Sequence, residues 1–299
     1  MERQPTARLI PRLTEAHGHI IADGADYRAA QLRHRDGVDR EFVRSQFETL
    51  RSAGVAFYRD GGDALGVSVY AKTVAAQYGI DYRTPAFILH RAGRYGAAYG
   101  RSYRDLAEAR GRVAEAASLG ADFVKIAAGG LLDFAGDGAV TGEPLPEDEI
   151  AALVEIAAAQ GFAVMAHVSG AASVSAAVRA GVRSVEHGFW ADQTSLELMR
   201  DRGTVWVPTA ATVRNNLDGR RYPAGTMRRI ADAHEKNILF ASKIGVLIAS
   251  GSDAGAYNVP QGAGAAGEAA YLRGLGVDID AGNAAVAETF RRLTLRLPR

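Results

Sequence analysis

The chain of 299 residues contains no cysteine, which excludes disulfide bonds and thiolate zinc sites, so any metal ion must use nitrogen and oxygen ligands. An excess of either charge is also missing, because 35 basic and 34 acidic residues leave a net charge of +1. This balance gives no reason to expect nucleic acid or an anionic membrane as a partner. We expect small molecules as partners, and leave association into homo-oligomers open.

Long apolar runs are absent as well. No window reaches the length of a transmembrane helix, and the first residues lack the apolar stretch of a signal peptide, so we expect a cytoplasmic protein. With 47% hydrophobic and 23% charged residues, the chain can nevertheless bury a large core. No linker divides it, which predicts a single domain over residues 1–299.

A local pattern recurs along the chain, in which a helical segment ends in glycine and an apolar run follows at once. Glycine is typical just past a helix C-terminus, where the backbone turns left-handed. The pattern occurs at Gly54, Gly79, Gly120, Gly161, Gly181, Gly203 and Gly245. With residues 12–20 as the first strand, it predicts eight buried strands.

Eight strands that alternate with helices in about 300 residues favour a (β/α)8 barrel, the TIM-barrel fold. No dinucleotide or P-loop glycine fingerprint follows the first strand, which disfavours an open doubly wound sheet. Helices are predicted at residues 39–53, 103–119, 146–160, 171–180, 193–202 and 224–244. The glycine-rich segments 127–145 and 254–267 resist this interpretation, and are either lids over a substrate or surface loops.

Six residues carry the chemistry of this predicted barrel. They are His17, His19, Lys125, His167, His187 and Asp253. The last four follow their glycines by five to eight residues, which places them near strand C-terminal ends, where barrels of this type hold their active sites. A single histidine is usually a packing or surface residue, but this many on one rim predict a site.

The spacing of these residues suits metal ions. His17 and His19 are two apart in a strand and point the same way, so both can ligate one cation. His167 and His187 lie on adjacent predicted strands and can hold a second cation. Asp253 adds an oxygen ligand on the last strand, which lies beside the first when the barrel closes.

Lys125 is unusual among metal ligands, because an ammonium group has no lone pair. Burial and neighbouring positive charge lower the pKa of a lysine, and the neutral amine can take up carbon dioxide. The carbamate formed in this way is an anionic bridge suited to two metal ions. The alternative is a lysine that pairs with a carboxylate of the barrel.

These motifs together resemble the amidohydrolase superfamily, in particular its branch of imidazolonepropionases and metal-dependent prolidases. The matching stretches are His17-Gly18-His19, Val124-Lys125-Ile126 with Gly129-Gly130, Ala166 to Gly170, Ala180 to Gly188 and Gly251 to Gly255. The resemblance implies that His17, His19 and Asp253 hold one metal. It also implies that His167 and His187 hold the second metal, and that carboxylated Lys125 bridges the two. Members of the superfamily usually add a small β-sandwich built from both ends of the chain; because His17 lies almost at the start of this sequence, we expect either a bare barrel or a fragment.

The resemblance implies metal-assisted hydrolysis of an amide-type C–N bond in a cyclic amide or a small N-acyl or peptide substrate. A hydroxide bridging two divalent ions, by default Zn²⁺, would attack the carbonyl, with Asp253 as general base. A deaminase is disfavoured because Gly170 stands where its glutamate would be expected. A lactonase or ester hydrolase on the same site stays open, as does a barrel that binds a ligand without catalysis.

The residues that recognise the substrate are harder to predict. The candidates are His90, Arg91, Arg94, Arg59 and Trp190, which follow or end strands near the predicted site. His90 could bind a carbonyl oxygen and an arginine could bind a carboxylate, although arginines at strand ends often pair with aspartates. His34 and His234 lie in polar sequence, and we expect them on the surface.

Overall fold

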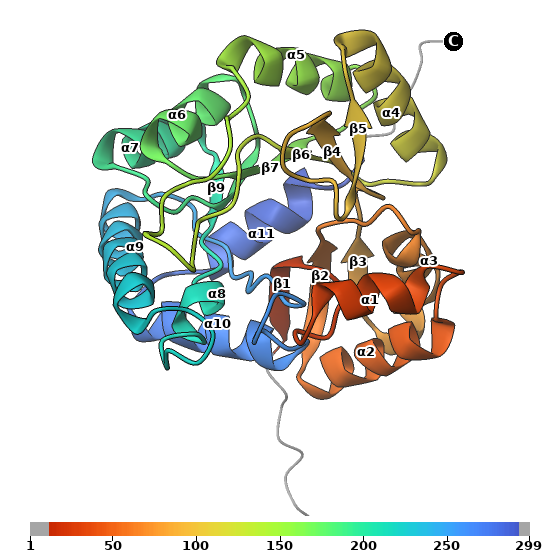
Figure 1. The fold of residues 1–299 in the computed structure, drawn as a ribbon, viewed down its shortest axis with the longest axis horizontal. Helices are drawn as coiled ribbons and strands as arrows, with labels where there is room; N and C mark the ends of the chain where they lie inside the picture. The colour runs from red at the N-terminus through yellow and green to blue at the C-terminus, as the bar shows by residue number, and fades with distance from the viewer. Residues whose placement is uncertain (1–11, 293–299) are drawn as a thin grey trace, which may run out of the picture.

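Residues 12–292, described by a computed structural model, form a (β/α)8 barrel with an outer ring of helices, as the sequence predicts (Figure 1). The strands are β1 (Leu13–Gly18), β2 (Val55–Asp60), β3 (Asp81–Arg83), β4 (Ile88–Arg91), β5 (Gly100–Tyr103), β6 (Val124–Ala127), β7 (Val164–Val168), β8 (Ser184–His187) and β9 (Val205–Val207). The paired strands are parallel, in the orders β1-β2-β3 and β5-β4-β6-β7-β8-β9.

The predicted eighth strand is irregular but occupies its position in the barrel. Ile248 forms a parallel bridge to Trp206 of β9, and Ala254 forms one to Gly18 of β1. The segment from residue 246 to residue 254 therefore connects the last and first strands. This closure brings Asp253 next to β1, where its backbone N–H donates to the carbonyl oxygen of His17 at 2.7 Å.

The third barrel position differs from the prediction, because it is broken into β3 and β4. Pro85 lies between the two pieces and has no N–H to donate to a neighbouring strand. The following residue, Ala86, has a left-handed φ of 67°. As a result β3 pairs with β2, whereas β4 pairs with β6 and with the additional strand β5.

The helices are α1 (Tyr27–His34), α2 (Arg40–Ser52), α3 (Val67–Val74), the 3-10 helix η1 (Ala75–Tyr78), α4 (Leu106–Ser118), α5 (Glu147–Ala158), α6 (Ala171–Arg179), α7 (Gln193–Arg202), α8 (Ala211–Arg214), α9 (Ala224–Ile244), α10 (Ala263–Gly274) and α11 (Asp280–Thr289). Each of the six predicted helices is present, with ends that differ by three residues at most. Local chemistry explains such boundaries: Asp192 caps α7 by accepting from Ser195 N at 2.8 Å, and Gly203 ends it with φ 62°.

Helix α11 lies across the middle of the ring rather than within it (Figure 1). Its Val286 and the following Phe290 are fully buried and pack with Phe57, Phe123 and Met165 from the barrel interior. The rings of Phe290 and Phe123 meet edge to face, with centroids 5.4 Å apart. These contacts fill the barrel below the strand C-terminal ends. In the described part of the chain, no helix combines the length and apolar character that crossing a membrane requires.

Candidate active site

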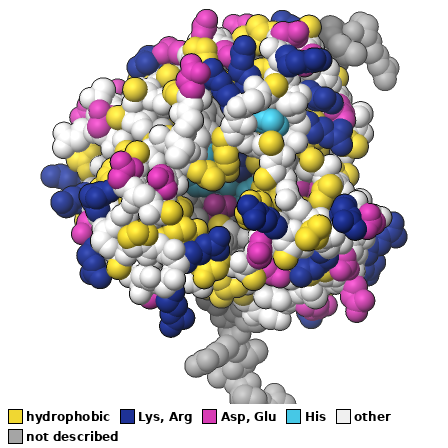
Figure 2. Space-filling model, in the orientation of Figure 1, with side chains coloured by type: hydrophobic (Ala, Val, Ile, Leu, Met, Phe, Trp, Pro, Cys, Tyr) yellow, Lys and Arg dark blue, Asp and Glu magenta, His cyan; other side chains and the backbone are white. Residues whose placement is uncertain are grey.

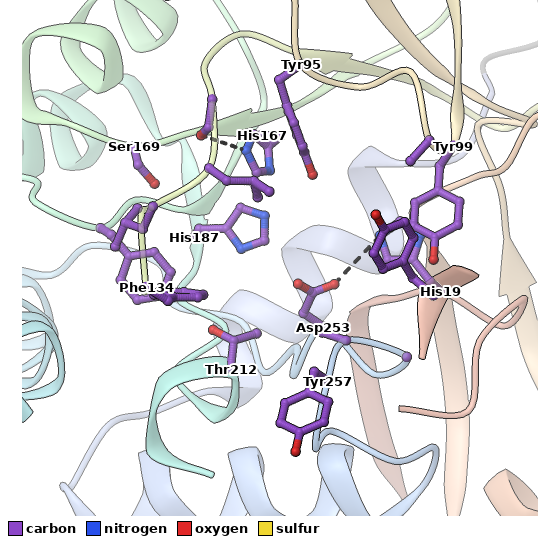
Figure 3. A pocket seen from close by; sticks show the side chains of 18 of the residues that line it. His19, Tyr95, Tyr99, Phe134, His167, Ser169, His187, Thr212, Asp253 and Tyr257 are labelled. Carbon is purple, nitrogen blue, oxygen red and sulfur yellow. Dashed lines mark hydrogen bonds and ion pairs between the residues drawn. The ribbon is translucent and has the colours of Figure 1, made fainter. Parts of the chain in front are cut away.

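The structure brings all six predicted residues to one cavity. Four of them lie at or near the C-terminal ends of their strands: His17 is the last residue but one of β1, Lys125 lies on β6, His167 on β7 and His187 at the end of β8. His19 follows directly after β1. Asp253 lies in the irregular segment of residues 246–254, which occupies the eighth barrel position and is called the eighth segment below. All six line a cavity of about 530 Å³ at this end of the barrel. Figure 3 shows His19, His167, His187 and Asp253 around its base.

Distances within the group are short. The Nε2 atoms of His17 and His19 each lie 3.6 Å from Oδ1 of Asp253, and Lys125 Nζ lies 2.9 Å from His17 Nε2. His17, His187 and Asp253 each offer a ligand atom within 4.8 Å of the others. The ring of His187 lies 4.5 Å from that of His167 and 4.9 Å from that of His17, centroid to centroid. One compact group therefore contains residues predicted for each of the two metals.

Hydrogen bonds orient three of the histidine rings. His17 Nδ1 lies 2.7 Å from the carboxylate of Glu186 and donates to it, which leaves the lone pair on Nε2 facing the cavity. The hydroxyl of Thr209 donates to Pro208 O, so it accepts from His187 Nδ1 at 2.8 Å. His167 Nε2 donates to Gly130 O at 3.1 Å. Each ring thus keeps one nitrogen available as a ligand.

The Glu186 carboxylate is itself held within the barrel. Arg59 Nη2 donates to it at 2.8 Å, Ser184 donates its hydroxyl to the same oxygen, and Arg59 Nε donates to Ala16 O at 2.6 Å. Arg59 and Glu186 are fully buried. This network connects β1, β2 and β8 below the site and fixes the ring of His17.

Burial dominates the titration of the cluster. It lowers the pKa of His17, His19 and His187 well below the ordinary value and that of His167 to about 3, with positive neighbours adding to the effect. Burial also lowers the pKa of Lys125 to about 8 and raises that of Asp253 to about 6. The histidines are therefore neutral at pH 7, with lone pairs available, and a fraction of Lys125 is the free amine.

Strained backbone is concentrated at the same strand ends. His187, Thr209 and Asp253 have left-handed φ values of 69°, 51° and 61°. This conformation costs about 1 to 3 kcal/mol for a residue other than glycine and is typically found at functional sites. Here it directs three polar side chains, two of them predicted ligands, to the cavity or its supporting contacts.

Aromatic side chains line much of the cavity wall. The ring of Tyr95 lies 4.6 Å from that of His167, and the ring of Tyr99 stacks on His19 at 5.1 Å. In Figure 3 the hydroxyl of Tyr95 points to the middle of the pocket. Neither tyrosine hydroxyl has a hydrogen-bond partner within residues 12–292. Burial raises the pKa of both, so each stays a donor at neutral pH.

None of the five predicted substrate-binding residues lines this cavity. Arg59 points into the barrel core, because the buried Glu186 is its partner. Arg91 pairs with Glu149 at 2.6 Å, Arg94 pairs with Glu143 at 3.0 Å, and His90 Nδ1 contacts the carbonyl oxygen of Arg91. Trp190 donates to Gly138 O at 2.7 Å and so packs against the segment after β6.

The expectation that His34 and His234 lie on the surface is wrong, since their exposed fractions are 1% and 3%. His34 Nδ1 accepts from Asp39 N at 3.0 Å, which ties the end of α1 to the start of α2. His234 Nε2 donates to Pro208 O at 2.9 Å beneath the site. The expectation failed because polar neighbours in the sequence do not reveal which face of a helix meets the barrel.

Several site residues were not predicted from the sequence. Glu186 is a charged residue in a four-residue buried strand, and this alone signals a specific partner. Tyr95 and Tyr99 lie in a segment between β4 and β5 that has no periodicity, so nothing local predicts their orientation. The two glycine-rich segments, residues 127–145 and 254–267, both contribute to the cavity wall, for example through Phe134 and Tyr257 (Figure 3).

The sequence matches the profile of the Amidohydrolase family over residues 9–291. It is 29% identical to an ochratoxinase of Aspergillus niger over 278 residues, which cover 82% of this chain and 58% of that protein. It is 28% identical to an uncharacterized protein of Mycobacterium tuberculosis over 262 residues, which cover 83% and 64% of the two chains. The chain thus spans less than two thirds of the length of these relatives.

Solved structures show the same fold. A Xaa-Pro dipeptidase with bound methionine superimposes with a TM-score of 0.74 at 23% identity, covering 94% of this chain and 75% of the dipeptidase. The structure of the A. niger ochratoxinase superimposes with a TM-score of 0.71 at 23% identity, covering 94% and 70%. A molinate hydrolase matches with a TM-score of 0.73 at 18% identity, covering 98% and 77%.

Proposed function

The chain belongs to the amidohydrolase family, and on this premise we propose that it is a metal-dependent hydrolase of amide-type C–N bonds. The observation that carries the proposal is the convergence of four histidines, one aspartate and one lysine at the base of a single cavity. The names of the ochratoxinase and Xaa-Pro dipeptidase relatives support hydrolysis as the class of reaction.

The donor set fits divalent cations. Lone pairs of His17 and a carboxylate oxygen of Asp253 approach each other in a buried group, and Nδ1 of His19 is buried without a hydrogen-bond partner among the described residues. Such a group is costly to bury unless something binds it. We propose that His17, His19 and Asp253 hold one ion and that His167 and His187 hold another.

Lys125, in its carboxylated form, would supply a donor to both ions. Its Nζ lies 2.9 Å from His17 Nε2 and it is 2% exposed. Reaction of the free amine with carbon dioxide would form an N–C bond and release one proton to solvent, and the resulting carbamate would be an anionic oxygen donor, whereas an ammonium group repels cations. When bound, two divalent ions, by default Zn²⁺, supply Lewis acidity that polarises a carbonyl group and lowers the pKa of water.

The protein's own residues would then position the substrate and move the proton. Asp253 lies at the base of the cavity and would take a proton from the attacking water and deliver it to the leaving nitrogen, so that the hydroxyl group of the water bonds to the carbonyl carbon and the C–N bond breaks. Tyr95 projects its free hydroxyl into the same space and would donate a hydrogen bond to the carbonyl oxygen. Glu186 and Arg59 would keep the ring of His17 oriented.

The test is turnover by the chain purified without chelators and supplied with Zn²⁺ and bicarbonate. N-benzoylphenylalanine, a dipeptide and a lactone are compared as substrates. We expect the two amides to be cleaved, Asp253→Asn to remove turnover while the chain still folds, and Tyr95→Phe to reduce kcat by about 100-fold. Cleavage of the lactone alone would reassign the enzyme as an ester hydrolase. Binding of these compounds without any turnover would indicate a non-catalytic barrel.

A further inference from the structure

We propose that Arg221, at the edge of the cavity, binds a carboxylate of the substrate and thereby makes the enzyme select anionic amides. The inference rests on the proposed function, because it assigns a substrate class to the same cavity. Arg221 lines the cavity, as does Lys125, which is buried at its base among the predicted ligands. Figure 2 shows the cavity as a hollow in this face, with basic side chains at its edge.

Aromatic rings hold the Arg221 side chain in place. Its guanidinium carbon lies 3.9 Å from the ring centroid of Tyr257 and 5.5 Å from that of Tyr222, and both tyrosines line the cavity. Stacking on Tyr257 occupies one face of the planar guanidinium. The N–H donors lie in the plane of the group, so its edge stays available for two parallel hydrogen bonds to a carboxylate.

No carboxylate among the described residues pairs with this guanidinium. Within residues 12–292, Arg221 forms no ion pair shorter than 4.0 Å, whereas the adjacent Arg220 pairs with Asp218 at 3.0 Å. The other acidic groups at the cavity edge accept from backbone N–H groups. Asp26 accepts from Arg28 N at 2.7 Å, and Asp133 accepts from Gly136 N at 2.9 Å.

The wall beside Arg221 is apolar and aromatic. The ring of Phe134 lies 5.4 Å from that of Tyr222, which in turn lies 6.3 Å from that of Tyr257. These rings come from three separate segments that meet at the cavity, and they offer a surface for a ring or a long apolar chain. The combination favours N-acyl amino acids that carry an aromatic or large apolar group and a free carboxylate.

Binding of two non-hydrolysable probes tests this inference independently of turnover. The probes are N-benzenesulfonylphenylalanine and N-benzenesulfonylphenethylamine, which differ only in the carboxylate. We expect the metal-loaded wild type to bind the carboxylate probe about three- to tenfold more tightly in titration calorimetry. Arg221→Gln should remove this preference, and Arg221→Lys should keep part of it. The matched control Arg220→Gln, at an exposed paired arginine, should leave it unchanged.

Three results would overturn the inference: equal affinity of the wild type for both probes, no binding of either probe, or a preference that survives in Arg221→Gln. Failure of the proposed function has a different signature, which is absence of hydrolysis of N-benzoylphenylalanine while the sulfonamides still bind. If hydrolysis occurs, Arg221→Gln should raise KM for N-benzoylphenylalanine by a similar factor. It should leave KM for N-benzoylphenethylamine, which lacks the carboxylate, unchanged.

Discussion

Lys125 links the titration of a single side chain to assembly of the proposed metal site. Burial is the largest cause of its lowered pKa of about 8. Only the neutral amine reacts with carbon dioxide, and its fraction rises about tenfold per pH unit below the pKa and levels off above it. We therefore expect Zn²⁺ uptake, at a fixed concentration of dissolved carbon dioxide, to accelerate from pH 6 to pH 8 and then reach a plateau.

Stopped-flow measurement of Zn²⁺ uptake by chelator-treated protein, with and without carbon dioxide, checks this prediction. The variant Lys125→Ala provides the control, since it has no amine to carboxylate and should take up metal at a rate that carbon dioxide does not change. A wild-type rate that is independent of carbon dioxide at every pH would contradict the role given to Lys125.

Residue types and their spacing were enough to predict which six side chains would meet. Their orientation could not be predicted, because it depends on neighbours from other strands: Glu186 orients His17 across the barrel, and Thr209 orients His187 from the end of the next strand. Arg59 shows the same limit. Its place at the end of a strand suggested the cavity, whereas its partner Glu186 draws it into the core.

At the scale of elements, the buried Arg59–Glu186 pair holds β2 against β8. Replacing Arg59 with methionine would leave the Glu186 carboxylate buried without its main partner, and we expect a loss of about 3 to 5 kcal/mol in the free energy of unfolding. Arg51→Met is the matched control, because the Arg51–Glu48 pair has side chains 60% and 54% exposed and should contribute less than about 1 kcal/mol. Urea denaturation measures the free energy of unfolding of both variants. Equal losses would contradict the stabilising role given to the buried Arg59–Glu186 pair.

Helix α11 depends on a glycine at its contact with the eighth segment. A Cβ atom on Gly282 would lie 2.1 Å from Ile248 O, so Gly282→Ala must displace backbone, and we expect a loss of about 1 to 3 kcal/mol. Gly267 in α10 has no atom within 4 Å of such a Cβ, and Gly267→Ala should instead stabilise by about 0.5 to 1 kcal/mol. Thermal unfolding of the pair tests the contact; similar effects of both substitutions would show that α11 does not pack closely there.

Helix boundaries followed from local signals, as at Asp192 and Gly203, whereas two barrel strands did not match a simple prediction. The third is interrupted at Pro85, a signal present in the sequence, and its halves pair with different sheets. The eighth forms no regular strand and is held in place by single bridges to β9 and β1. Sequence periodicity cannot predict that outcome, because it depends on which strands close the barrel.

For the whole molecule, the family and the barrel are established, and the single domain over residues 1–299, the cytoplasmic compartment and the oligomeric state stay predictions. Metal ions that bind the folded but not the unfolded chain stabilise it. We expect a chelator to lower the melting temperature of the wild type and to have a much smaller effect on Lys125→Ala. An equal shift in both proteins would indicate metal binding that does not depend on Lys125.

The central claim is a pair of divalent ions bridged through Lys125, and metal content per chain tests it most directly. Elemental mass spectrometry on protein purified without chelators should find close to two divalent ions per wild-type chain and a sharp fall in Lys125→Ala. About one ion in both proteins would contradict the bridged pair and give Lys125 a structural role. No bound ion after addition of Zn²⁺ and bicarbonate would contradict the metal-dependent mechanism itself.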